Sequence, residues 1–152
     1  MTQIRKILLV EDSSNDAELT IEALSAHRLA NEILHLRDGE EALDYLYGRG
    51  QFVGRPDGTP ACVLLDLKMP KVDGFEVLEQ MKSDPRLSSI PVVVLTSSRE
   101  ERDLLESYKL GVNGYVVKPV DFDAFQDAVH QIGGFWAVIN EVPAGSLPLG
   151  SE

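Results

Sequence analysis

The sequence predicts an α/β fold in which an open parallel sheet is covered by helices on both faces. Short apolar runs alternate along the chain with longer stretches whose apolar residues recur at helical spacing. The apolar runs are unbroken, which is typical of strands buried on both faces of a parallel sheet. Five such runs occur, which suits a doubly wound sheet and is too few for an eight-stranded barrel.

Two strand–helix units are predicted in the first third of the chain. The strands are the apolar runs Ile7–Val10 and Ile33–Leu36. Ser13 and Asp16 have the spacing of a capping box, so the first helix is expected to begin there. Asp38 is expected to cap the second helix. The inner faces of the two helices would be formed by Ala17, Ile21, Leu24, Ala42, Leu43 and Leu46.

The segment Gly48–Pro60 is rich in glycine and proline and is predicted to be a loop. It is long for this type of connection, where about 2–6 residues are usual. Ala61–Leu65 follows as a fully apolar strand that ends at Asp66. A third helix is expected to end at Pro85. Its inner face is indicated by Phe75, Leu78 and Met81.

The last two units follow the same plan. Pro91–Leu95 is the clearest strand in the chain and ends at Thr96. Arg99–Leu110 is predicted as the fourth helix. Gly114–Val117 is the fifth strand and ends at Lys118-Pro119. The last helix is expected to begin after a capping Asp121 and to carry Phe122, Phe125, Val129, Ile132 and Trp136 on one face.

Length and composition predict one folded domain with a short tail. The chain has 152 residues, of which 43% are hydrophobic, and a single core typically serves about 100–200 residues. Residues 1–139 are assigned to the domain. Residues 140–152 are expected to form a flexible tail, because proline and glycine recur there without an apolar pattern.

Charge and cysteine content exclude several classes of partner and location. The net charge is −11 and the pI is about 4.6, whereas nucleic acid and anionic membranes require clustered basic residues. Apolar runs are too short for a membrane span, and no secretory signal is recognised. Cys62 is the single cysteine, which fits a reducing compartment. We therefore expect a cytoplasmic protein that binds neither nucleic acid nor membrane.

Polar residues that could bind a ligand or take part in a reaction stand at the ends of the predicted strands. Glu11 and Asp12 follow the first strand, Asp66 the third, Thr96 the fourth and Lys118 the fifth. The carboxyl edge of an open α/β sheet is where ligands bind. If the first strand is central, three carboxylates meet there, and a cation such as Mg²⁺ would neutralise them.

Each of these residues also has a structural interpretation. A strand-end aspartate or Thr96 could cap a helix, the Glu11-Asp12 pair could be a solvated turn, and Lys118 could lie on the surface. The functional interpretation is favoured because every strand end but one carries a reactive or ligating group. No chemistry is assigned to Cys62 or to the scattered His27, His35 and His130.

Five short motifs surround these strand ends in a fixed order. They are Val10-Glu11-Asp12, Leu64-Leu65-Asp66-Leu67-Lys68-Met69-Pro70, Asp73-Gly74, Leu95-Thr96-Ser97 and Tyr115-Val116-Val117-Lys118-Pro119. Together they resemble the receiver domain of two-component response regulators, from about Ile7 to about Ile132. The resemblance implies a flavodoxin-like receiver fold, with a five-stranded parallel sheet in the order 2-1-3-4-5 and five helices.

The resemblance also implies a role for each residue of the site. Asp66 aligns with the phosphoacceptor. Asp12 and Asp66 would hold Mg²⁺ together with the backbone carbonyl of Lys68, and Glu11 would reach the ion through water. Glu11 stands where aspartate is commoner in the family, and Lys68 stands where many relatives have a short polar side chain.

The remaining roles concern the phosphoryl group and the switch that follows its transfer. Lys118 would pair with a phosphoryl oxygen, and Thr96 would move to hydrogen-bond the phosphoryl group. Tyr115 would then turn inward into the space that Thr96 leaves. Lys118-Pro119 matches the family's cis peptide bond.

As a whole, the chain resembles a stand-alone bacterial response regulator that takes a phosphoryl group from a sensor histidine kinase and is not itself an enzyme. The Gly48–Pro60 loop and the Phe135-Trp136 pair are similar to regulators that partner bacterial and cyanobacterial phytochromes. The downstream partner is an unknown protein target, or a phosphotransfer histidine that receives the phosphoryl group in turn.

A symmetric homodimer is expected through the fourth helix, fifth strand and fifth helix. The last helix would overhang the sheet and leave Phe135, Trp136 and Ile139 partly uncovered, and phytochrome-linked regulators often pair through this face. Alternatively, Gly133-Gly134 would end the helix and fold Trp136 back onto the monomer.

Other functions on the same topology fit the sequence less well. A phosphatase with an aspartate nucleophile would need an acid where Lys68 stands. A nucleotide- or flavin-binding module would need a glycine-rich turn where Glu11 and Asp12 stand. A degenerate receiver that only binds proteins is disfavoured, because the acceptor, the acids, the threonine and the lysine are all present.

Overall fold

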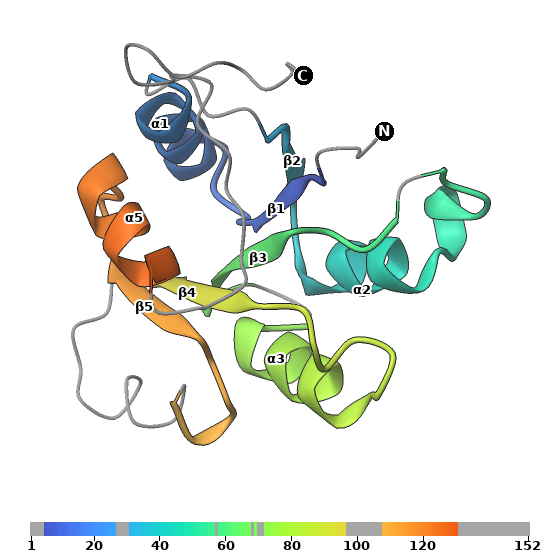
Figure 1. The fold of residues 1–152 in the computed structure, drawn as a ribbon. Helices are drawn as coiled ribbons and strands as arrows, with labels where there is room; N and C mark the ends of the chain where they lie inside the picture. The colour runs from blue at the N-terminus through green and yellow to red at the C-terminus, as the bar shows by residue number, and fades with distance from the viewer. Residues whose placement is uncertain are drawn as a thin grey trace, which may run out of the picture.

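The computed structural model of the protein describes residues 5–26, 31–56, 58–67, 69, 72–96 and 108–130. Five parallel strands form one sheet in the order β2-β1-β3-β4-β5, as Figure 1 shows. They are β1 (Ile7–Val10), β2 (Ile33–Leu36), β3 (Cys62–Asp66), β4 (Val92–Thr96) and β5 (Gly114–Val117). The predicted strand order is confirmed, and β1 lies inside the sheet, next to β3.

Helices cover both faces of the sheet, so the fold is doubly wound. The described residues form α1 (Ser14–Ser25), α2 (Gly39–Tyr47), α3 (Gly74–Ser83) and α5 (Phe122–His130), with a short 3-10 helix η1 (Gly50–Phe52). α1 and α5 lie on one side of the sheet, and α2 and α3 lie on the other (Figure 1). Most of the predicted fourth helix lies outside the described residues. Among these residues, no helix has the length and apolar character to cross a membrane.

The sheet separates two hydrophobic cores, which explains the unbroken apolar runs. In β1, Leu8 and Val10 pack into the core under α2 and α3, whereas Ile7 and Leu9 pack into the core under α1 and α5. All four side chains are fully buried. Because successive side chains point to opposite faces of a strand, every position of such a strand must be apolar. Cys62 lies in the second core, and burial raises the pKa of its thiol.

The helix starts follow the sequence signals, with one difference at α1. The Ser13 hydroxyl accepts a hydrogen bond from the Asp16 amide at 3.1 Å, and Asp38 accepts one from the Glu41 amide at 2.8 Å. The other half of the expected capping box is wrong, because the Ser13 amide donates to Glu11 Oε2 at 3.1 Å instead. The Asp16 carboxylate is 3.0 Å from Lys118 Nζ. Asp16 therefore pairs with Lys118, which directly follows β5, and not with the Ser13 amide.

The long segment between α2 and β3 is folded against α2 rather than extended into solvent. The Phe52 ring of η1 meets the Tyr45 ring edge-on, with centroids 5.1 Å apart. The Arg55 guanidinium lies 4.0 Å from the centre of the Tyr45 ring, and its Nε donates to the Tyr45 carbonyl at 2.6 Å. Gly48 ends α2 in the left-handed conformation, with φ +67°, which favours glycine.

Candidate functional site

Three carboxylates meet at the carboxyl end of the sheet. Glu11 and Asp12 directly follow β1, and Asp66 is the last residue of β3. The two strands are paired in parallel with Val10 opposite Leu65, so the next residue of each strand falls side by side. Glu11, Asp12 and Asp66 each offer an oxygen, and these oxygens lie within 4.8 Å of one another. Glu11 and Asp66 are buried, whereas Asp12 is exposed.

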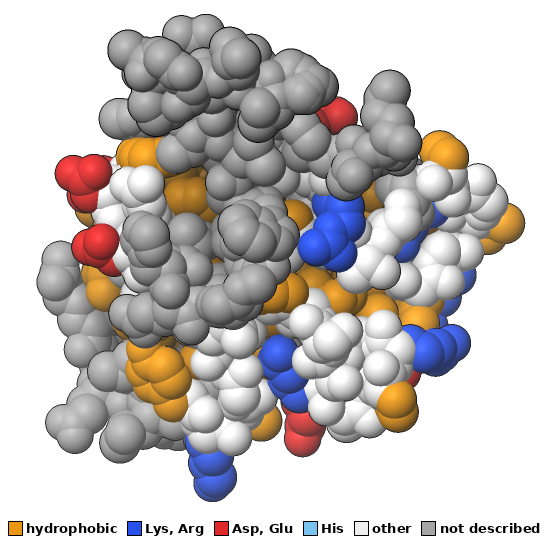
Figure 2. Space-filling view, in the orientation of Figure 1, with side chains coloured by type: hydrophobic (Ala, Val, Ile, Leu, Met, Phe, Trp, Pro, Cys, Tyr) orange, Lys and Arg blue, Asp and Glu red, His pale blue; other side chains and the backbone are white. Residues whose placement is uncertain are grey.

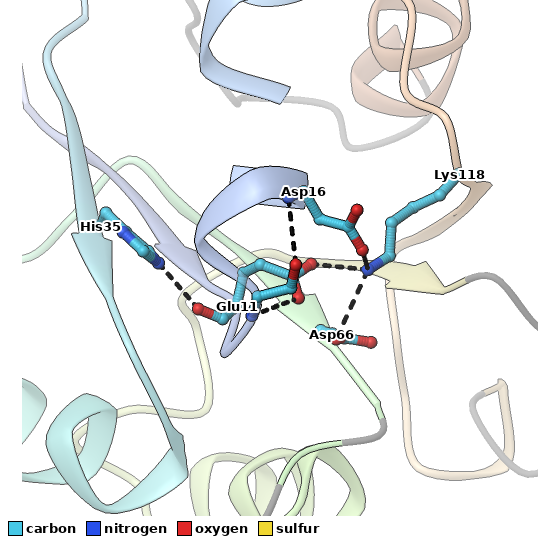
Figure 3. Close-up of polar contacts among 6 residues, drawn as sticks. Glu11, Asp16, His35, Asp66 and Lys118 are labelled. Carbon is cyan, nitrogen blue, oxygen red and sulfur yellow. Dashed lines mark hydrogen bonds and ion pairs between the residues drawn. The ribbon is translucent and has the colours of Figure 1, made fainter. Parts of the chain in front are cut away.

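Lys118 reaches this group from the end of β5. Its ammonium lies 2.6 Å from Glu11 Oε1, 3.0 Å from Asp16 Oδ2 and 3.5 Å from Asp66 Oδ2. Figure 3 shows the lysine side chain directed at all three carboxylates. Burial alone would lower the pKa of Lys118, but the contacts with these carboxylates outweigh it and raise the pKa. Lys118 is therefore protonated throughout the neutral range.

Glu11 is fixed by its main chain as well as by its side chain. Its amide donates to the Leu36 carbonyl at 3.0 Å, and its carbonyl lies 2.7 Å from His35 Nε2. A carbonyl oxygen can only accept, so this ring nitrogen carries the hydrogen. The second carboxylate oxygen of Glu11, Oε2, accepts a hydrogen bond from the Ser13 amide. The contact from His35, to which the sequence assigned no chemistry, helps to orient the buried glutamate (Figure 3).

Asp16 is a neighbour of these residues that sequence reasoning missed. It was expected only as part of a helix cap, whereas its carboxylate pairs with Lys118. The available signal was its position four residues after Asp12, in the first turn of α1, because side chains in that turn can point back toward the end of the preceding strand. The spacing alone names no partner on β5, so the contact could not be read from the sequence.

The Asp73-Gly74 motif joins the start of α3 to the end of β3. Asp73 caps α3 in a reciprocal capping box with Glu76, and the Gly74 amide donates to the Leu67 carbonyl at 2.9 Å. A Cβ atom at Gly74 would collide with the backbone of Asp66 and Leu67. Glycine is therefore required by the close approach of the helix to the strand end that carries Asp66.

The other predicted site residues are described only in part. Thr96 ends β4 opposite Val117, but its side chain is not among those described. Tyr115 lies in β5, is half-buried and packs against the core under α2 and α3. The Lys118-Pro119 bond is cis, as predicted. Four further predicted residues lie outside the described residues, namely Lys68, Phe135, Trp136 and Ile139.

We refer to Glu11, Asp12, Asp66 and Lys118 as the acidic site. Together with Asp16, its carboxylates can carry four negative charges, against the single positive charge of Lys118. Crowded like charges are costly unless a cation neutralises them, and carboxylate oxygens are the ligands that Mg²⁺ prefers. The donor set of Glu11, Asp12 and Asp66 therefore fits a hard divalent ion.

Comparison with known proteins identifies similar chains. The sequence profile described as the response regulator receiver domain matches residues 7–130. The probable methanogenesis regulatory protein FilR2 of Methanothrix harundinacea is 44% identical over 137 residues, which cover 90% of this chain and 86% of that protein. Response regulator Rcp1 of Synechocystis sp. is 42% identical over 138 residues, which cover 91% and 92%.

Solved structures agree with the sequence comparison. The bacteriophytochrome response regulator AtBRR has a TM-score of 0.85 and 58% identity, covering 92% of this chain and all of that one. The Mn²⁺-bound form of Rcp1 has a TM-score of 0.72 and 42% identity, covering 92% and 99%. The phosphorylated cyanobacterial phytochrome response regulator RcpA has a TM-score of 0.70 and 42% identity, covering 86% and 91%.

Proposed function

The chain belongs to the family of response regulator receiver domains, and from this premise we propose that it accepts a phosphoryl group on Asp66 and changes conformation in response. The observation that carries the proposal is the cluster of Glu11, Asp12 and Asp66, within 4.8 Å of one another. Lys118 Nζ stands 3.5 Å from Asp66 Oδ2. This combination suits a carboxylate that must approach an anionic phosphoryl group.

Each residue of the acidic site has a part in the transfer. An oxygen of Asp66 forms the bond to phosphorus, and the bond between phosphorus and the donor nitrogen breaks, with its electron pair leaving on the donor. Asp12 and Asp66 would hold Mg²⁺ with the main-chain carbonyl of Lys68, and Glu11 would reach the ion through water. When bound, the ion supplies neutralisation of the negative charge on the acceptor and on the phosphoryl group.

Lys118 is the residue that would hold the transferred phosphoryl group. Its ammonium needs to move only from the carboxylate of Asp66 to an oxygen of the group attached there, as a point charge that follows the new anion. Thr96 would hydrogen-bond the phosphoryl group, and Tyr115 would turn inward as the readout of the switch. Tyr115 is half-buried and packs against the core under α2 and α3.

The donor in this proposal is a sensor histidine kinase, and specifically a phytochrome. Similarity to the bacteriophytochrome response regulator AtBRR and the cyanobacterial phytochrome response regulator RcpA supports the choice, since 58% and 42% of aligned positions are identical. The protein would act in the bacterial cytoplasm as a signalling protein rather than an enzyme, with residues 1–139 as the receiver and 140–152 as a flexible tail. Its target would be a downstream protein, or a histidine that accepts the phosphoryl group onward.

A homodimer is the second part of the proposal. Phe135, Trp136 and Ile139 would form its contact surface with the face that includes β5 and α5. A two-fold contact uses each residue twice, so Trp136→Ala should shift the protein toward monomer in sedimentation equilibrium. Wild-type protein that stays monomeric at high concentration, with and without a phosphoryl mimic, would refute the dimer.

The test of the function is phosphotransfer from autophosphorylated histidine kinases of the source organism, with its phytochrome kinase among them. We expect the phytochrome kinase to transfer fastest, in the presence of Mg²⁺, and the label to be labile to alkali as an acyl phosphate. Asp66→Asn should accept no label, whereas Asp127→Asn, which removes an exposed carboxylate of α5, should be labelled normally. Equal labelling of Asp66→Asn and wild type would overturn the proposal.

A further inference from the structure

Asp16 contacts the acidic site without belonging to its ligand group. Its Oδ2 lies 3.0 Å from Lys118 Nζ, and its side chain is 41% exposed against 2% for Glu11. The three carboxylates whose oxygens lie within 4.8 Å of one another are Glu11, Asp12 and Asp66, and Asp16 is not among them. Asp16 thus touches the lysine of the site and stands outside the group that fits a metal ion.

Lys118 and a divalent ion would draw on the same carboxylates. In the structure, the Lys118 ammonium is neutralised by Glu11 at 2.6 Å and Asp66 at 3.5 Å, in addition to Asp16. An ion held at the acidic site, directly by Asp66 and through water by Glu11, would withdraw part of their negative charge from the lysine and would repel its ammonium. A further anion that faces the lysine lowers the cost of placing two cations side by side.

Of the three carboxylates that contact Lys118, Asp16 is the one outside the group that fits the ion. We propose that Asp16 is a positioning residue, which holds the Lys118 ammonium beside the acidic site and thereby allows Mg²⁺ to bind there. This inference rests on the proposed function, because it concerns the metal at the same site. Asp16 then neutralises more of the lysine's charge in the metal-bound state than in the metal-free state. By linkage, this differential contact raises the affinity for the ion.

If the ion pair between Asp16 and Lys118 had only a structural role, a different result would be expected. If Asp16 only tied α1 to the end of β5, its removal would lower the stability of metal-free and metal-bound protein equally and leave the affinity unchanged. If Asp16 only added negative charge to the surroundings, any exposed carboxylate of α1 would have a similar effect on the ion. Glu18 is such a carboxylate, since it is exposed on the same helix.

The experiment is isothermal titration calorimetry of the full chain with Mg²⁺, which measures the affinity for the ion. The variants are Asp16→Asn, Glu18→Gln and Lys118→Met, together with Lys118→Met combined with each of the first two. We expect Asp16→Asn to weaken Mg²⁺ binding about two- to fivefold, the range that a partly exposed ion pair supports. Glu18→Gln should change it less than Asp16→Asn. In the Lys118→Met background, Asp16→Asn should have no larger effect than Glu18→Gln, because the residue through which it acts is gone.

Three results would overturn the inference. One is an Mg²⁺ affinity of Asp16→Asn equal to that of wild type or of Glu18→Gln. Another is a loss of Mg²⁺ affinity on Asp16→Asn that is equally large in the Lys118→Met background, because Asp16 would then act on the ion directly. Wild-type protein that binds no Mg²⁺ would overturn the metal site of the proposed function and this inference with it, whereas the first two results leave that function standing. Circular dichroism of each variant verifies that the fold is retained.

Discussion

Two charged regions of the molecule are built in opposite ways. In the acidic site, Lys118 is only 11% exposed and faces several carboxylates. On the side of the molecule that carries α2 and α3, Tyr47, Asp84 and Arg86 form what we call the Tyr47 cluster. There Arg86 is 75% exposed and lies 2.9 Å from Asp84, and the Tyr47 hydroxyl donates to Asp84 at 2.6 Å. Figure 2 shows basic side chains spread over that side of the protein.

The difference lies in charge balance and in access to water. In the Tyr47 cluster one carboxylate meets one guanidinium, so the charges balance, and the 75% exposed Arg86 remains in contact with water. Such a pair costs little to form and contributes little to stability. In the acidic site, negative charges outnumber the lysine and two of the carboxylates are buried, which is costly in the absence of a ligand. A cluster of buried carboxylates that is unfavourable for folding without a cation is the arrangement expected at a binding site.

Removal of the buried lysine should have the largest effect on stability. Lys118→Met leaves the acidic carboxylates without this counter-ion, and we expect a loss of about 3–5 kcal/mol in the free energy of unfolding without metal. Mg²⁺ should reduce the loss, because the ion replaces the missing positive charge. Urea denaturation in EDTA and in Mg²⁺ measures both values. Lys6→Met, at an ion pair of 4.0 Å, is the control and should have little effect.

The stability difference between wild type and Lys118→Met should also depend on pH in a defined way. The raised pKa of Lys118 means that its stabilising contribution is complete below the unfolded value of about 10.4 and is lost as pH rises through the folded value. The difference in stability between wild type and Lys118→Met should therefore be constant from about pH 6 to 9. A difference that disappears within this range would contradict the role of Lys118 as a protonated counter-ion.

A smaller loss is expected where α3 approaches the acidic site. In Gly74→Ala, the new methyl group would collide with the backbone of Asp66 and Leu67, and overpacking of this kind costs about 1–3 kcal/mol. Because the displaced strand end carries Asp66, phosphorylation should slow as well. The matched control is Gly58→Ala, where a Cβ would meet open space. Normal stability and normal phosphorylation of Gly74→Ala would show that the contact is unimportant.

A variant outside the acidic site should affect stability alone. Arg55→Ala removes the guanidinium over the Tyr45 ring at 4.0 Å and the hydrogen bond to the Tyr45 carbonyl, so we expect a loss of about 1 kcal/mol. Mg²⁺ affinity should be unchanged. The control is Arg37→Ala, an exposed arginine. If Arg55→Ala altered the Mg²⁺ affinity, the two regions would be coupled and the comparison would fail.

The smallest effect is expected in the Tyr47 cluster. Hydrogen bonds from Arg86 and then from Tyr47 lower the pKa of Asp84. Its contribution to stability is therefore present above the unfolded pKa of about 3.9 and is lost as pH falls through the lower folded value. Thermal unfolding of Asp84→Asn should show a small deficit above about pH 5 that shrinks in stronger acid. A deficit that grows in acid would contradict this; Glu79→Gln, an exposed carboxylate of α3, is the control.

The sequence predicts the sheet well because its signals are local. Each strand is an apolar run, and Ser13, Asp38 and Asp121 cap helices as their positions indicate. The acidic residues were predicted to meet because the carboxyl ends of parallel strands share one edge. The remaining contacts depend on tertiary placement, which no spacing encodes. The Arg55–Tyr45 packing, the His35 contact with Glu11 and the pairing of Asp16 with Lys118 are of this kind.

The most direct test of the account is whether the acidic site makes Asp66 a metal-dependent phosphoryl acceptor. Purified protein is incubated with a small phosphodonor, with Mg²⁺ or with EDTA, and its intact mass is measured beside that of Asp66→Asn. We predict that wild type gains one phosphoryl group in Mg²⁺, that it gains none in EDTA, and that Asp66→Asn gains none in either. Phosphorylation of wild type that is equally complete in EDTA, or of Asp66→Asn in Mg²⁺, would contradict it.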